Sequence, residues 1–99
     1  MIVVRDVFHL HFGKTRDALA LMKEGRAIEQ RMGYPLSRVL VDMTGTYYTL
    51  VNESHFESLA DLEAVLGKMG QDPDWRAWYA RFVPLVREGR REVYRVVEV

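Results

Sequence analysis

The segment at residues 72–86 reads DPDWRAWYARFVPLV and describes a helix with a sharp start. Asp72 can accept hydrogen bonds from free backbone N–H groups of the first turn, and Pro73 lies where its missing N–H costs nothing. Four aromatic residues then recur at helical spacing and form one face, namely Trp75, Trp78, Tyr79 and Phe82. A face of this kind needs a surface to pack against, so the helix belongs to a layered fold with a core.

Composition restricts the class of protein. The chain has 99 residues, and we assign residues 1–99 to a single domain. Its 14 basic residues balance 14 acidic ones, which argues against nucleic acid or an anionic membrane as partner. No cysteine is present, which excludes disulfides and thiolate metal sites. No apolar run could span a bilayer and the first residues do not resemble a signal peptide, so we expect a soluble, cytoplasmic protein.

Strand-like and helix-like patterns alternate along the rest of the chain. Four segments rich in β-branched and aromatic residues predict strands, at residues 2–12, 36–43, 46–56 and 91–99. Two segments predict helices, at residues 15–32 and 59–68. This order predicts an α+β fold of the ferredoxin-like, split βαβ type, with a four-stranded antiparallel sheet and helices on one face.

Local signals fix the ends of several elements. We expect Thr15 to cap the first helix, Gly33 to end it, and Ser58 to cap the second helix. Gly25 lies inside the apolar stripe of the first helix, which indicates a close approach to the sheet. Gly89 is expected to supply the turn into the last strand. The predicted buried stripe of the first helix consists of Ala18, Leu21, Met22, Gly25, Ile28 and Met32.

The two middle strands are predicted to form a hairpin. The dipeptide Thr44-Gly45 separates them, and a two-residue link with glycine is typical of a tight turn. In the register that such a turn imposes, Val41 would pair with Tyr48.

Alternation along the strands gives the sheet two faces of different character. One face of the first strand is apolar and suits contact with helices, through Val4, Phe8, Leu10 and Phe12. The opposite face of the sheet mixes apolar with polar residues, among them Val7, Leu40, Val51, His9, His11, Asp42 and Tyr47. A surface of that composition suits packing on a second copy around a small cavity, so we expect a two-fold homodimer.

Three runs in the second half of the chain resemble NIPSNAP-type proteins. They are SLADLEA at 58–64, DPDWRAW at 72–78 and VPLV at 83–86. Such proteins belong to the dimeric α/β barrel superfamily, which includes antibiotic-biosynthesis monooxygenases and haem-degrading proteins. The resemblance therefore implies a dimeric α/β barrel, whereas it implies no particular activity, because the NIPSNAP family lacks a well-defined chemistry.

His9 and His11 form the sharpest candidate site. They are two residues apart on a predicted strand, so both side chains point to one side. The predicted topology brings Asp42 and Tyr47 beside them, and such a cluster could bind and deprotonate an acidic organic molecule. A ligand pocket without chemistry, or a hydrogen-bonded polar layer at a dimer seam, would use the same residues. His55 is expected at the far end of its strand, which argues against a three-histidine metal site.

Three more residues are expected to contact a ligand. Thr49 shares a strand face with Tyr47, and Trp75 and Trp78 are expected to line the edge of the pocket with their indole rings. We predict neither a metal nor a cofactor.

These residues predict a homodimer that binds a small, partly apolar organic ligand, with its activity undetermined. One alternative is a cofactor-independent monooxygenase or isomerase of the same superfamily, in which His9 or His11 is the base and Tyr47 or Trp78 orients the substrate. Another is a purely structural or regulatory dimer with a filled barrel. A cavity of several hundred Å³ that opens beside His9 and His11 would favour binding or catalysis, and a dry, filled barrel would favour the structural role.

Overall fold

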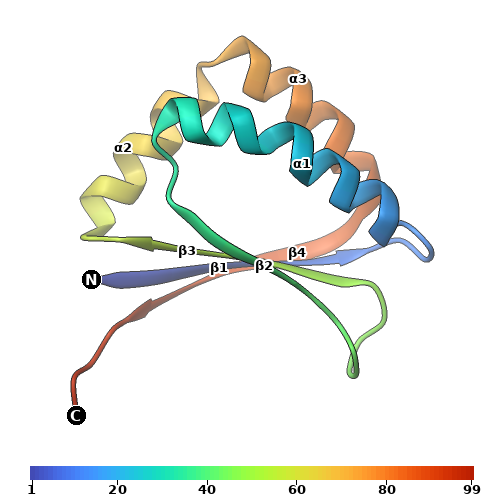
Figure 1. Ribbon diagram of the computed structural model, residues 1–99, viewed down its shortest axis with the longest axis horizontal. Helices are drawn as coiled ribbons and strands as arrows, with labels where there is room; N and C mark the ends of the chain where they lie inside the picture. Colours follow the sequence, from blue (N-terminus) through green and yellow to red (C-terminus); the bar gives the residue numbers. More distant parts are fainter.

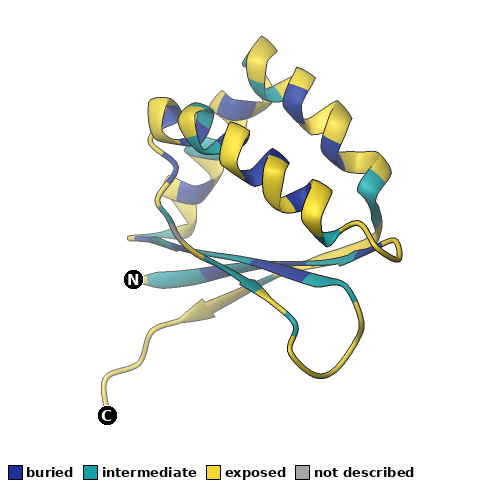
Figure 2. Cartoon of the chain, turned by 45° about the vertical axis from the view of Figure 1, so that its right-hand side comes forward, coloured by how far each residue is buried: buried dark blue, intermediate teal, exposed yellow. Residues whose placement is uncertain are grey.

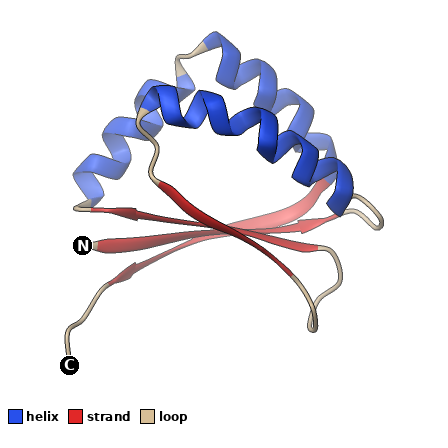
Figure 3. Ribbon diagram, viewed as in Figure 1, coloured by secondary structure: helices blue, strands red, loops and turns tan.

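Four strands form one antiparallel sheet in the order β2-β3-β1-β4, and three helices cover one of its faces (Figure 1; Figure 3). The computed structural model describes residues 1–99, except for the side chain of Ser37. The elements in chain order are β1 (Ile2–Leu10), α1 (Thr15–Met32), β2 (Leu36–Val41), β3 (Thr49–Phe56), α2 (Leu59–Gly70), α3 (Pro73–Phe82), the short 3₁₀ helix η1 (Val83–Leu85) and β4 (Val86–Arg95). This is the α+β, ferredoxin-like arrangement expected from the sequence.

Most helix ends lie where the local signals place them, although α2 continues to Gly70, two residues beyond its expected end, and one expected cap is wrong. The Asp72 carboxylate accepts a hydrogen bond from the Trp75 N–H at 2.9 Å, and the Ser58 hydroxyl accepts one from the Asp61 N–H at 3.2 Å. α1 ends at Gly33, whose φ of +79° is left-handed, as expected. The expected Thr15 cap is wrong, because this residue is already helical and the residue before it makes no capping side-chain bond.

The core lies between the helices and the sheet, and the buried stripes of the helices face it (Figure 2). Val4, Leu10 and Leu50 are almost inaccessible on the sheet, and Ala18 and Phe82 are equally buried on the helices. The predicted stripe of α1 is confirmed with one correction. Ile28 is only half-buried, and the buried position at that turn is occupied by Glu29.

Gly25 makes room for an indole ring and not for the sheet. A Cβ at this position would lie 2.8 Å from Cε2 of Trp78, which is closer than side-chain carbons approach one another. α1 and α3 therefore contact each other closely at this point. The close approach was expected, but its partner was misassigned.

The link between β2 and β3 is a seven-residue loop, 42–48, and the expected two-residue turn is wrong. Val41 pairs with Leu50, two residues beyond the partner that the tight turn would impose. Tyr48 lies in the loop with a positive φ of 57°. Because strand side chains alternate with a period of two, a shift of two residues leaves Val39, Leu40 and Val41 on their expected faces, whereas the register is irregular between Leu36 and Arg38.

The last strand begins five residues earlier than expected and ends at Arg95, while β1 ends at Leu10 and not at residue 12. Gly89 is not a turn, since it lies within β4 opposite Phe8. A Cβ at Gly89 would lie 2.9 Å from the backbone oxygen of Val7, so this glycine permits close strand contact. The chain beyond β4 leaves the sheet on the side opposite the helices, as does loop 42–48 (Figure 1).

Candidate functional site

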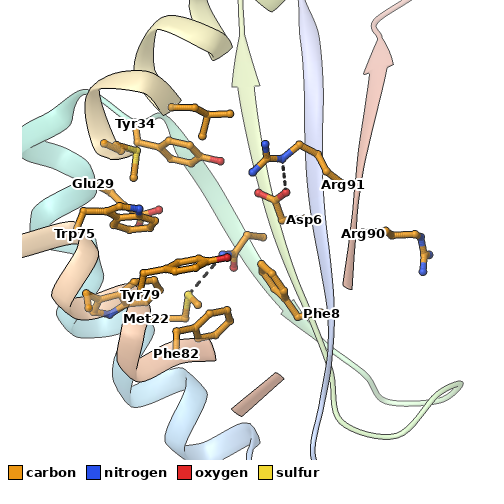
Figure 4. A pocket seen from close by; sticks show the side chains of 14 residues that line it. Asp6, Phe8, Met22, Glu29, Tyr34, Trp75, Tyr79, Phe82, Arg90 and Arg91 are labelled. Atoms are coloured by element: carbon orange, nitrogen blue, oxygen red, sulfur yellow. Dashed lines mark hydrogen bonds and ion pairs between the residues drawn. The ribbon is translucent and has the colours of Figure 1, made fainter. Parts of the chain in front are cut away.

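A cavity of about 240 Å³ lies between the sheet and the helices (Figure 4). It receives side chains from β1, β3 and β4 on the sheet side and from α1, α2 and α3 on the helix side. An engineered apolar cavity of about 150 Å³ is enough to bind benzene, so this volume admits a molecule with one substituted ring.

Aromatic rings form one wall of the cavity. Trp75 and Trp78 stack at 4.8 Å between ring centroids, and Trp78 stacks on Phe82 at 5.3 Å. Phe8 on β1 meets Phe82 edge-on at 5.0 Å. The Trp78 indole N–H donates to the backbone oxygen of Leu21 at 2.6 Å, which holds the ring in place and uses its only donor.

Glu29 contributes a carboxyl group to the same cavity. The residue is only 6% exposed, and burial raises its pKa from 4.5 to about 7. The neighbouring guanidinium of Arg26 opposes this rise, and the carboxylate of Asp6 adds to it. Among the described side chains, none forms a hydrogen bond or ion pair with the Glu29 carboxyl.

The other polar groups of the cavity are mostly paired with one another. Arg91 on β4 donates to the carboxylate of Asp6 on β1 at 2.7 Å (Figure 4). The hydroxyl groups of Tyr34 and Ser54 share a buried hydrogen bond at 3.2 Å. The pKa of the Tyr34 phenol is raised, mainly because the side chain is buried.

Asn52 is the exception, because its side-chain oxygen is buried without a partner among the described residues. Its amide nitrogen reaches only the thioether sulfur of Met22, at 3.6 Å, which is a weak contact. The cavity therefore contains two acceptors, on Asn52 and Glu29, that the described residues leave without donors.

The uncovered face of the sheet is organised in rows that cross the strands. The first row alternates in charge across all four strands and consists of Arg38, Glu53, Arg5 and Glu92. The next row is apolar over three strands and consists of Leu40, Val51 and Val7. The third row is polar again and contains Thr49 and His9, which pair across β3 and β1. A shallow hollow of about 270 Å³ lies over the second and third rows.

Three of the expected site residues meet on this uncovered face. The His9 ring nitrogen Nδ1 lies 3.1 Å from the Thr49 hydroxyl, and the Asp42 carboxylate accepts the Thr49 backbone N–H at 2.8 Å. The Thr49 hydroxyl itself donates to the backbone oxygen of Thr46. This hydrogen-bonded group lines the shallow hollow and also stabilises the start of β3.

The remaining expected site residues lie elsewhere. His11 follows the end of β1 and is exposed, and Tyr47 is exposed in the loop, where its ring meets that of Phe12. Trp75 and Trp78 line the cavity on the opposite side of the sheet. The seven expected residues therefore do not form one site, since the sheet separates the indoles from the His9 group.

His55 pairs with Val3 at the opposite end of β1 from His9, as expected. Among the described residues, no three histidine, cysteine or acidic side chains lie together as a possible metal site. No helix within the described part of the chain is long and apolar enough to cross a membrane.

The sequence prediction missed Glu29, Asn52 and Asp6 as cavity residues. Glu29 carries a recognisable signal, because it lies four residues after Gly25 and seven after Met22, on the apolar stripe of α1. A charged residue at a buried helical position indicates either a paired structural group or a functional one. Asp6 and Asn52 follow from the paired register of β1 and β3, which places them opposite each other.

The fold and the cavity define the class of protein, a ferredoxin-like α+β protein with a sheet–helix pocket. The family model for NIPSNAP matches residues 6–99, and the chain belongs to the NIPSNAP family. No curated protein matches the chain.

Solved structures similar to this chain fall into two groups. A NIPSNAP family protein from Agrobacterium tumefaciens is 23% identical, with 98% of this chain and 93% of that chain covered and a TM-score of 0.92. An uncharacterized NIPSNAP domain protein from Burkholderia xenovorans is 20% identical, with 98% of this chain and 95% of that chain covered and a TM-score of 0.91. A putative antibiotic biosynthesis monooxygenase from Nitrosomonas europaea is 12% identical, with 99% of this chain and 100% of that chain covered and a TM-score of 0.75. At these identities the likeness shows a shared fold.

Proposed function

We propose that this protein is a homodimer that binds a small, partly apolar organic ligand in the cavity between its sheet and its helices. The observation that carries the proposal is a space of about 240 Å³ with stacked aromatic rings on one wall and buried polar groups opposite. Pockets for small organic molecules combine an apolar lining with a few fixed polar groups in this way.

The uncovered sheet face supports the dimer. Its apolar row is bordered on both sides by polar rows, and a second copy related by a two-fold axis would place the same rows opposite each other. Apolar side chains also crowd the neighbouring loop region, where Met43 is 97% exposed and Phe12 is 76% exposed. A chain of this size gains stability by covering such groups.

A cofactor-independent monooxygenase or isomerase is the second candidate. It is favoured by the fold shared with a protein described as an antibiotic biosynthesis monooxygenase and by the pKa of about 7 at Glu29, which suits a general base near neutral pH. Under this candidate, oxygen uptake or isomerisation of phenols and quinols would be measurable. Unchanged turnover in the variants His9→Ala and His11→Ala would exclude the histidines as bases.

Tryptophan fluorescence tests ligand binding directly, because the chain has two tryptophans and both line the cavity. Titration with single-ring compounds such as anisole should change the emission in a saturable way and raise the melting temperature. Absence of saturable binding for every single-ring probe, by fluorescence and by calorimetry, would refute the proposed function. Light scattering on the same sample should give twice the chain mass of 11.6 kDa.

A further inference from the structure

Two hydrogen-bond acceptors on the polar side of the cavity lack a donor among the described residues. The side-chain oxygen of Asn52 is buried without a partner, and the carboxyl of Glu29, a residue that is 6% exposed, forms no hydrogen bond or ion pair there. A buried polar group without a partner is destabilising, so such groups are satisfied by water or by a ligand in the functioning protein.

Several donors that line the cavity are already in use, although one guanidinium nitrogen of Arg26 and the Tyr79 hydroxyl are not paired among the described residues. The Trp78 N–H is bound to a backbone oxygen, Arg91 is paired with Asp6, and the Tyr34 hydroxyl is engaged with Ser54. Arg90 projects away from the cavity in Figure 4, and its guanidinium pairs with Glu92 at 2.8 Å. None of these recorded hydrogen bonds or ion pairs reaches Glu29 or the side-chain oxygen of Asn52, so a molecule that brings a donor of its own can satisfy these acceptors.

We propose that the ligand is a single-ring aromatic compound with a hydroxyl group, that this hydroxyl donates to the Glu29 carboxylate, and that Glu29 thereby selects the ligand. This inference rests on the proposed function and names the chemistry that the same cavity would accept. The flat aromatic wall suits a ring, and the volume admits one substituted ring.

Other ligand charges fit less well. An anionic ligand such as a carboxylate would meet the carboxyl groups of Glu29 and Asp6, with Arg91 already neutralised by the latter. A cationic ligand would approach Glu29 beside the guanidinium of Arg26, which interacts electrostatically with the same carboxyl group. A neutral molecule with a hydroxyl donor satisfies the open acceptors without either repulsion.

The ionisation of Glu29 makes the interaction depend on pH. The titratable and charged side chains around it are Arg26 on the same helix, Asp6 on β1, Arg90 and Arg91 on β4, Tyr34 after α1 and Tyr79 on α3. Because its pKa is about 7, the carboxylate form predominates at pH 8 and the neutral acid predominates at pH 6. The carboxylate is the stronger acceptor, so hydroxyl ligands should bind more tightly at pH 8 than at pH 6, by about fivefold.

The test compares phenol with anisole, which has the same ring but a methyl ether in place of the hydroxyl. Binding to each compound is measured by tryptophan fluorescence and by calorimetry at pH 8 and at pH 6. We expect the full-length protein to bind phenol about tenfold more tightly than anisole at pH 8, the effect of one hydrogen bond to a charged acceptor.

Two variants separate the role of Glu29 from the role of the cavity. Glu29→Gln retains only a neutral acceptor, so it should lose most of the preference for phenol and all of the pH dependence, whereas Glu63→Gln, an exposed site on α2, should behave like the unmodified protein. Equal binding of phenol and anisole to the unmodified protein would overturn this inference and leave the proposed function intact. Binding of neither compound would overturn both. The comparison on the unmodified protein holds whether or not a variant folds.

Discussion

Replacing Glu29 by glutamine should change how the stability of the protein depends on pH. In the folded protein, burial raises the pKa of this carboxyl group from 4.5 to about 7. The folded state therefore holds the proton more tightly than the unfolded state does. The stabilising effect of the neutral carboxyl is fully present below pH 4.5 and is lost as the pH rises through 7, where the group must be charged inside the cavity.

The size of the expected change in stability follows from the difference between the pKa of Glu29 in the folded and unfolded states. Each pKa unit corresponds to about 1.36 kcal/mol, so a change from 4.5 to about 7 sets an upper limit of about 3.4 kcal/mol. About 2.5 kcal/mol of this falls between pH 5 and pH 8 when both ionisation curves are integrated. Water that enters the cavity screens the charge, and we expect an observed loss of about 1.5 kcal/mol.

The assay is urea unfolding of the unmodified protein and of Glu29→Gln at pH 5 and at pH 8. All residues other than position 29 are the same in both proteins, so their contribution cancels in the difference between the two pH profiles. Glutamine is neutral throughout, and the variant should gain about 1.5 kcal/mol relative to the unmodified protein between pH 5 and pH 8. Parallel pH profiles for the two proteins would refute the assignment of a buried, protonated Glu29.

Three further changes test the packing and the assembly. Gly25→Ala should destabilise the protein by about 1–2 kcal/mol in urea unfolding, because the added methyl group would be overpacked against the indole ring of Trp78. The control Gly67→Ala, with open space around it, should stabilise the protein by about 0.5–1 kcal/mol. Changes in stability of the same sign for both variants would count against the contact between Gly25 and Trp78. Tyr34→Phe should cost about 1 kcal/mol, and much less in a Ser54→Ala background, since the hydrogen bond they share is then already lost; equal costs would argue against that bond. Leu40→Lys, which places a charge in the apolar row, should halve the mass measured by light scattering, and an unchanged dimer mass would show that this face is not the interface.

The sequence determines the helix ends well because their signals are local. Asp72, Ser58 and Gly33 each act within one helical turn, and each does in the structure what its residue type predicts. The strand order also follows, since a split βαβ pattern leaves few topologies.

Geometry set by distant contacts is harder to predict. Thr44-Gly45 is a strong local signal for a tight turn, but the Asp42 carboxylate binds the Thr49 N–H and closes a wider loop. Gly25 indicates close packing without naming its partner, because Trp78 lies 53 residues further along the chain. The faces of residues 39–41 survive the error in register, since an even shift preserves alternation.

The candidate site shows the same contrast between features set by local signals and features set by distant contacts. Of the expected cluster, His9 and Asp42 lie on the uncovered face, where both contact Thr49, because strand order and alternation place them there; His11 and Tyr47 do not join them. The cavity on the other face was predicted only through Trp75 and Trp78, because its polar side depends on side chains from α1, β1, β3 and β4 that meet in space. A buried glutamate is recognisable in the helical pattern, but its lack of a partner emerges only from the packed structure.

A crystal structure of the protein soaked with phenol tests the central claim most directly. We predict the ring against the aromatic wall of the cavity, with its hydroxyl oxygen within hydrogen-bond distance of the Glu29 carboxyl. A ring bound beside His9 on the uncovered sheet face, with the cavity filled only by water, would contradict the account.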